Sequence, residues 1–234
     1  MAAASSSVAA APREFASDDP ASRPYAWRRG ELLPLHEAAR RGDAPAVAAL
    51  LRGGVPAEAS SDKGDTALHW AAVGGHVAVM KELLAAGADW AAECDWDEIS
   101  TATRPLHCAA HGGRVEAVDA LLAAGADVHT KDDFGSTALH WAGGSGRAEA
   151  VDARLAAGAD VHAKDDYSST ALHSAGVSGR AEAVDALLAA GADVHAKNRD
   201  DSTALHGAGD SGRAEAVDAL VAAGADVHAK DDLG

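Results

Sequence analysis

The sequence predicts an all-α fold: a solenoid of stacked helix-turn-helix units with projecting, hairpin-like finger loops. The first observation behind this prediction is a Leu-His pair that recurs with histidine spacings of 33, 38, 33, 33 and 33 residues. The second is that the last two units are nearly copies, since Ser178–Lys197 and Ser211–Lys230 differ only at Leu188 and Val221. A unit of this length cannot bury its apolar face alone, so it must stack on its neighbours.

Composition alone points the other way, toward a disordered chain. The 234 residues carry a net charge of −16, and Leu, Ile, Val and Phe make up only 17% of them, against 61 alanines. Such a composition is typical of disordered chains. The periodicity of the sequence overrides this argument and predicts a folded domain with a thin, alanine-rich core. The acidic balance offers no basic stripe, which argues against nucleic-acid and membrane-surface partners. No apolar run approaches the roughly 20 residues of a membrane span.

The chain divides into a tail, a repeat domain and a short remainder. Residues 1–30 are rich in Ala, Ser and Pro without hydrophobic periodicity, so we expect a disordered tail. An organelle transit peptide is the alternative for this tail, because its start lacks acidic residues. Residues 31–230 are the predicted repeat domain, and 231–234 begin an incomplete seventh repeat. The six expected repeats are approximately 31–60, 61–92, 93–131, 132–164, 165–197 and 198–230.

One unit shows how the local sequence specifies two helices. Thr170 is a favourable N-cap for a short helix that ends at Ser178 and the glycine after it. A second helix is expected from Arg180 to Ala190, with a narrow apolar stripe on one face. Gly191 supplies the left-handed cap that ends it. The connector to the next unit is extended and rich in turn residues.

These motifs resemble those of the ankyrin-repeat family. The family's Thr-Pro-Leu-His-x-Ala opening appears as Thr66–Ala71 and, in altered form, as Arg104–Ala109. Its Gly-Ala-Asp-Val ending appears at 125–128, 158–161, 191–194 and 224–227. The resemblance implies fingers at right angles to the helices, a concave groove lined by the inner helices, and protein binding without catalysis. It also implies a framework role, with local hydrogen bonds, for the six Leu-His histidines, which are His36, His69, His107, His140, His173 and His206.

Unit two has a longer finger than the others. The five extra residues lie between residues 89 and 104, where Trp90 and Trp96 stand among acidic residues. Trp96 is a candidate anchor for a partner, because Trp is enriched at binding hot spots. The alternative is that Trp96 folds back over the thin core and that Trp90 replaces the usual Val.

Unit four departs from the pattern in its helices. Gly143 and Gly144 lie within its first helix, and each glycine costs about 1 kcal/mol relative to alanine there. Arg154 takes a position that is Leu in the neighbouring units, so its guanidinium should reach the edge of the core or leave a packing defect. We therefore expect unit four to be the weakest, either as a hinge or by drift without function.

No motif in the sequence indicates enzyme chemistry, a cofactor or a small-molecule substrate. The chain lacks G-x-S-x-G, the phosphate-binding G-x-x-x-x-G-K-S/T and H-E-x-x-H. The recurring His129, His162, His195 and His228 are one helix-packing distance apart, about 8–10 Å, too far to share a metal ion. A zinc site at Cys94, Cys108 and His111 is a weak alternative, since no paired C-x-x-C supports it. Two cysteines suit a reducing compartment, cytoplasmic or nuclear.

What remains is a surface for an unidentified protein partner. Phe134 and Tyr167 occupy the same finger-tip position in adjacent units, flanked by acidic residues. Aromatics among acids suggest a partner with basic and apolar features, although the acids could serve only solubility. The alternative function is that of a regulatory fragment of a larger enzyme or channel, since the sequence stops abruptly at Gly234. The candidate partner-binding residues are Trp96, Asp133, Phe134, Asp166, Tyr167, Arg199, Asp200, His111 and Val177.

Overall fold

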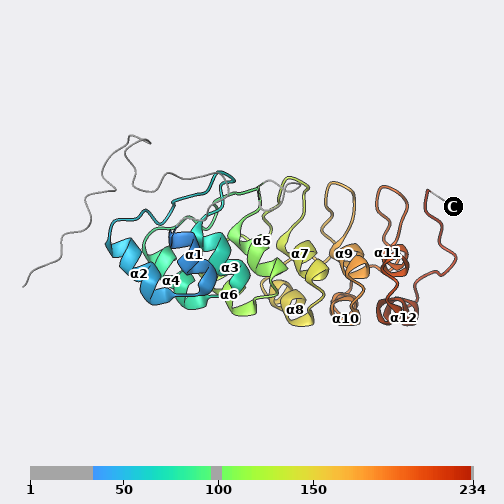
Figure 1. Ribbon diagram of the computed structural model, residues 1–234. Coiled ribbons are helices and arrows are strands. Elements are labelled where there is room, and N and C mark those ends of the chain that lie inside the picture. The colour runs from blue at the N-terminus through green and yellow to red at the C-terminus, as the bar shows by residue number, and fades with distance from the viewer. Residues whose placement is uncertain (1–33, 96–101, 233–234) are drawn as a thin grey trace, which may run out of the picture.

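The computed structural model describes residues 34–95 and 102–232, and the predicted tail and Trp96 lie outside them. Within this part, twelve helices form six hairpins stacked in one row, which confirms the predicted all-α solenoid (Figure 1). Odd-numbered helices form the inner layer beneath the fingers, and even-numbered helices form the outer layer. The helices are α1 Pro34–Arg41, α2 Ala44–Arg52, α3 Ala67–Gly74, α4 Val77–Ala85, α5 Pro105–His111, α6 Val115–Ala123, α7 Ala138–Ser145, α8 Ala148–Ala156, α9 Ala171–Ser178, α10 Ala181–Ala189, α11 Ala204–Ser211 and α12 Ala214–Ala222.

The ends of the helices follow the local sequence. Helix α9 begins directly after Thr170 and ends at Ser178, as predicted, and the next residue, Gly179, has a left-handed φ of 69°. Helix α10 follows Arg180, and Gly191 beyond its last turn has a φ of 90°. Capping and glycine punctuation therefore set the same boundaries in each unit. No described helix is long and apolar enough to cross a membrane.

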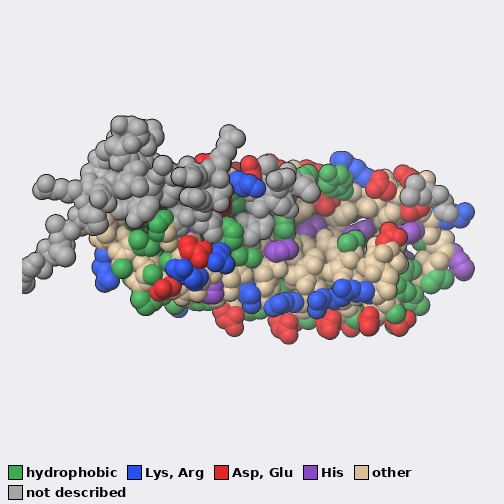
Figure 2. Space-filling view, viewed as in Figure 1, with side chains coloured by type: hydrophobic (Ala, Val, Ile, Leu, Met, Phe, Trp, Pro, Cys, Tyr) green, Lys and Arg blue, Asp and Glu red, His purple; other side chains and the backbone are tan. Residues whose placement is uncertain are grey.

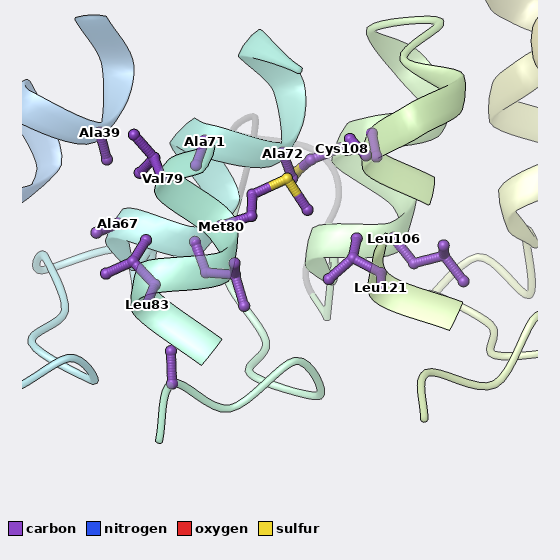
Figure 3. Packing of buried hydrophobic residues seen from close by; sticks show 14 of the residues in the cluster. Ala39, Ala67, Ala71, Ala72, Val79, Met80, Leu83, Leu106, Cys108 and Leu121 are labelled. Atoms are coloured by element: carbon purple, nitrogen blue, oxygen red, sulfur yellow. The ribbon is translucent and has the colours of Figure 1, made fainter. Parts of the chain in front are cut away.

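The core lies between the two helical layers and is built largely from alanine. The inner helices contribute Ala and, in α1, α3, α5, α7 and α9, one buried Leu each. The outer helices contribute larger side chains such as Val79, Met80 and Leu83. Figure 3 shows Met80 extending from α4 toward Cys108 on α5, so that side chains from neighbouring units interlock. Each unit is thus buried chiefly by its neighbours, as expected for a solenoid.

The fingers are joined to one another by backbone hydrogen bonds. The Asp166 N–H donates to the Phe134 carbonyl at 2.8 Å, and the Arg199 N–H donates to the Tyr167 carbonyl at 2.9 Å. The Lys131 ammonium donates to the Lys164 carbonyl at 2.9 Å. Neighbouring finger tips therefore form a continuous, hydrogen-bonded row rather than separate loops.

Arg154 corrects one expectation from the sequence. Its side chain does not reach the edge of the core but is fully buried, with 0% of the residue exposed. Its Nη1 donates to the Ala150 carbonyl at 2.6 Å, whereas Nε and Nη2 have no hydrogen-bond partner. Burial lowers the pKa of the guanidinium to about 10. The neighbouring helices leave this side chain no route to water, so the guanidinium stays in the core.

The glycines of the inner helices have a packing role that the sequence interpretation missed. A Cβ placed on Gly143 would lie 2.5 Å from the Ala171 carbonyl oxygen, and one on Gly176 would collide with the Ala204 carbonyl. Inner helices α7, α9 and α11 therefore approach so closely that alanine does not fit at the contact. Gly144, in contrast, has nothing within 4 Å of such a Cβ. Gly143 and Gly176 therefore have a structural role in the contact between inner helices, beside the two alternatives of a hinge or drift that the sequence left open for unit four.

Candidate functional site

Two aromatic side chains meet at the tips of adjacent fingers. The rings of Phe134 and Tyr167 are stacked, with centroids 6.2 Å apart and planes inclined by 29°. Tyr167 is 52% exposed, while Phe134 is partly buried. The Tyr167 side chain of the pair is therefore accessible to a partner. The sequence predicted that these residues share a finger-tip position. The structure shows in addition that their rings are close enough to interact.

Aspartate side chains at the base of each tip hold these aromatics in place. Asp132 Oδ1 accepts hydrogen bonds from the N–H groups of Phe134 at 3.0 Å and Ser136 at 2.8 Å. Asp165 Oδ1 likewise accepts hydrogen bonds from the N–H groups of Tyr167 at 2.9 Å and Ser169 at 2.8 Å. An aspartate that bonds to its own following backbone specifies a tight turn. The two tips consequently have the same shape.

Charged side chains of both signs surround the aromatic pair. Asp133 and Asp166 are exposed beside the rings, and Arg199 and Asp200 are exposed on the next tip. Figure 2 shows acidic, basic and hydrophobic side chains side by side at the ends of the fingers. Because these charges are in water, they can attract and orient a partner more than they can stabilise the fold.

His111 belongs to a second cluster, at the end of an inner helix. Its ring packs edge to face against Trp141 of the next unit, with centroids 5.5 Å apart and planes at 82°. Trp141 Nε1 donates to Asp132 Oδ2 at 3.0 Å, which connects the inner helix to the base of the finger. Trp70 Nε1 also donates to a finger aspartate, Asp65 Oδ2 at 2.6 Å, which is at a different position of the repeat. Sequence reasoning did not select Trp141, although its place directly after Leu-His, shared with Trp70, was a usable signal.

Val177 forms an apolar spot farther along the inner helices. It is 66% exposed, and a Cβ on Gly207 would lie 2.9 Å from its Cγ2. Val177 thus covers a residue without a side chain on the next inner helix. The structure groups Phe134 with Tyr167 and His111 with Trp141, while Val177 is not part of either pair.

Framework histidines such as His69 and His140 connect their unit to the next one. Nδ1 of His140 accepts from the Thr137 N–H at 3.2 Å, which leaves Nε2 as the donor to the Ser169 carbonyl at 3.1 Å in the following unit. His69 makes the same two contacts, with Thr66 and Thr103. Burial lowers the pKa of His140, and it lowers that of His69 to about 4. These rings are therefore held neutral, in the tautomer that both hydrogen bonds require.

The cysteines do not form a metal site. Cys94 and Cys108 are free and buried, and burial raises the pKa of the Cys94 thiol to about 12. The pKa of Cys108 is also raised by burial. His111, the third residue of the weak zinc hypothesis, lies against Trp141 instead. In residues 34–95 and 102–232, no group of three His, Cys, Asp or Glu side chains could hold a metal ion.

The stacked helical hairpins with linked fingers define a helical-repeat protein. The profile of the family described as "Ankyrin repeats (3 copies)" matches residues 29–94, 90–165, 106–198 and 153–231, and the chain belongs to this family. The human ASB11 ankyrin repeat domain has a similar solved structure, with a TM-score of 0.75 and 29% sequence identity. That match covers 87% of this chain and 89% of the ASB11 chain. None of the curated protein sequences compared with the chain matches it.

Proposed function

We propose that this chain is a non-catalytic module or scaffold that binds a protein partner through its finger tips and the groove of its inner helices. The partner has both basic and apolar features. Ankyrin repeats are generally protein–protein interaction modules, which supports the general part of this proposal. Both described cysteines are free thiols, in keeping with a reducing compartment, cytoplasmic or nuclear.

The stacked pair of Phe134 and Tyr167 is the observation that carries the proposal. An aromatic side chain that is half exposed contributes little to the fold, yet its ring is a typical anchor of a binding interface. Asp133 and Asp166 beside it favour a cation, and the face of a tyrosine ring also attracts Arg or Lys at close range. The backbone hydrogen bonds between the tips fix this arrangement before a partner arrives, which reduces the entropy lost on binding.

Site-specific photo-crosslinking tests the proposal. A photoreactive phenylalanine analogue at position 167 should capture a discrete partner from cell extract, and the Phe134→Ala/Tyr167→Ala double variant should lose that partner in a pull-down. The matched control places the analogue at Val221, which is 42% exposed on the outer helix of the last unit. The same partner crosslinked equally from both positions, or retained by the double variant, would contradict a site at the finger tips.

A further inference from the structure

A row of four exposed arginines follows the edge of the molecule where inner helices turn into outer helices. We call it the arginine row: Arg114, Arg147, Arg180 and Arg213, which immediately precede α6, α8, α10 and α12. All four are exposed. Figure 2 shows basic side chains in a row over α8 and α10, with a row of acidic side chains below. No basic stripe is visible along the sequence, because these residues are 33 positions apart in an acidic chain.

Packing against the preceding unit holds the stem of each arginine in place. A Cβ on Gly75 would lie 2.8 Å from Arg114 Cδ, and one on Gly179 would lie 2.6 Å from Arg213 Cδ. Gly113 and Gly146 lie in the same way under the other two stems. These glycines have left-handed backbone, where a side chain would be strained in any case. The four aliphatic stems are therefore ordered without a partner, and only the guanidinium ends extend into solvent.

The guanidinium groups of the row form no ion pairs with the described residues. Ion pairs among the described residues involve His36, Arg40, Arg41, Arg104 and Lys197, and none comes from the row. The nearest acids in sequence, such as Glu149 and Glu182, stand in the first turn of the outer helices, where a negative charge favours the helix dipole. Among the described residues, Arg114 is the one member of the row whose guanidinium donates a hydrogen bond to the protein, from Nε to the Val73 carbonyl at 3.2 Å. The row thus offers planar donor groups that suit carboxylates.

The spacing of the row indicates the form of its ligand. Neighbouring helices pack about 8–10 Å apart, so successive guanidinium groups repeat on that scale. An extended polyproline-type chain rises about 3.1 Å per residue, which places every third residue about 9.3 Å apart on one side. A carboxylate at every third position would therefore match the row. Such a chain is already extended in solution, so it loses little entropy when it binds.

We propose that the arginine row is a docking surface for an extended acidic segment, with a carboxylate at about every third residue. Charge complementarity selects this occupant, because four exposed arginines lie in line and none of them is in an ion pair, in a chain whose net charge is −16. The surface extends the proposed function, since it would bind an acidic segment while the finger tips bind a basic one. The two surfaces are at different edges of the repeats and can be tested separately.

Fluorescence anisotropy with two labelled peptides and the full chain tests this proposal. The first peptide repeats Glu-Pro-Pro four times, and the second replaces each Glu by Lys. At low ionic strength we expect the glutamate peptide to bind and its affinity to fall steeply with added salt. The triple variant Arg147→Gln/Arg180→Gln/Arg213→Gln should weaken it at least tenfold, because Gln preserves the packed stem and removes the charge. The matched triple Lys variant should keep most of the affinity, and circular dichroism verifies that both variants are folded.

Three outcomes would overturn the proposal. They are no binding of the glutamate peptide, equal binding by the triple Gln variant, and equal binding of a peptide with its four glutamates placed together. The Phe134→Ala/Tyr167→Ala variant separates this result from the proposed function. That variant should bind the glutamate peptide normally, even if it loses the lysine peptide and the cellular partner. If the test of the finger tips fails, the arginine row can therefore still be supported. If the test of the arginine row fails, the proposed site at the finger tips can still be supported.

Discussion

At the residue scale, Arg154 shows what a repeat can tolerate in its core. It occupies the position of Leu121 and Leu187 in the adjacent units, and it is equally buried. One Nη1 hydrogen bond to its own helix does not compensate a guanidinium removed from water, because Nε and Nη2 remain unpaired. The pKa, lowered to about 10 by burial, reflects the same penalty. Unit four therefore contains a local source of instability.

Replacing this arginine by the residue of its neighbours should stabilise the protein. We expect Arg154→Leu to raise the free energy of unfolding by about 2–4 kcal/mol, since it removes an uncompensated buried charge and adds apolar contact. Urea denaturation monitored by circular dichroism measures this change. The reciprocal variant Leu187→Arg should destabilise unit five. A lower stability for Arg154→Leu would show that unseen interactions hold the guanidinium.

The buried framework histidines predict a loss of stability in acid. Burial lowers the pKa of His69 from its ordinary value of 6.5 to about 4 in the folded protein, so the folded state binds fewer protons between these pH values. The stability contributed by neutral His69 is complete above pH 6.5 and falls as the pH drops from 6.5 to 4. The shift corresponds to about 3 kcal/mol at most.

Urea denaturation at pH 7.5, 6 and 5 measures this effect. The His69→Gln variant should have a shallower pH dependence than the natural chain, although it is less stable at pH 7.5. Comparing the two proteins removes the contribution of the many carboxylates, which is common to both. A control at His195, whose side chain is exposed and whose backbone N–H bonds to Asp193, should not change the slope. Equal slopes for His69→Gln and the natural chain would contradict the assignment.

At the scale of elements, the two glycines of α7 have different structural roles. Gly143 lies under the Ala171 carbonyl of α9, whereas Gly144 faces open space. Both lower the helix propensity equally, but only Gly143 permits the close approach of two inner helices. The spacing of the inner layer in units four to six is consequently set by Gly143 and Gly176.

Two alanine variants distinguish the packing role of Gly143 from the effect of Gly144 on helix propensity alone. Gly144→Ala should stabilise the protein by up to about 1 kcal/mol through helix propensity. Gly143→Ala should destabilise it by about 1–3 kcal/mol, because a methyl group would press on the α9 backbone. Thermal unfolding of the two variants side by side provides the measurement. If both variants were more stable than the natural chain, the close approach of α7 and α9 would not be rigid.

At the scale of the whole molecule, stability should vary along the solenoid. The buried side chains fall into two clusters: one extends from α1 to Ala138 at the start of α7, and the other from Leu139 to α12. In the two helices of the last unit only Ala204, Ala208, Ala216 and Leu220 are buried. Interior units are covered on both sides, whereas the described residues place no further unit beyond α12. Stability in a stacked array depends on such neighbour contacts.

Hydrogen exchange should reveal this gradient directly. We expect amides of α11 and α12 to exchange at least tenfold faster than those of α3 and α4, because the last unit has the fewest buried contacts. Mass spectrometry of peptides after timed exchange measures both regions in one sample. Arg154→Leu should slow exchange in units four and five more than in unit two. Uniform protection along the chain would mean that all units unfold in one step.

The candidate site was only partly predictable from the sequence. The common tip position of Phe134 and Tyr167 follows from the repeat, since residues at equal places in adjacent units become neighbours. The contact of His111 with Trp141 and the burial of Asp65 depend on rotamers and on the finger fold, which periodicity does not describe. The arginine row could not be recognised from the charge pattern along the chain, because its four arginines are 33 residues apart in the sequence.

Helix ends, unit length and the all-α solenoid were determined by the sequence itself, because capping residues, left-handed glycines and apolar spacing act within a few residues of one another. Only the tertiary structure decided how the surroundings of residues at equivalent repeat positions differ. Arg154 is enclosed rather than exposed, Gly143 is required while Gly144 is not, and the arginines lie in line. Each of these outcomes depends on the distance to the next unit, which packing of whole helices sets and which no local pattern in the sequence specifies.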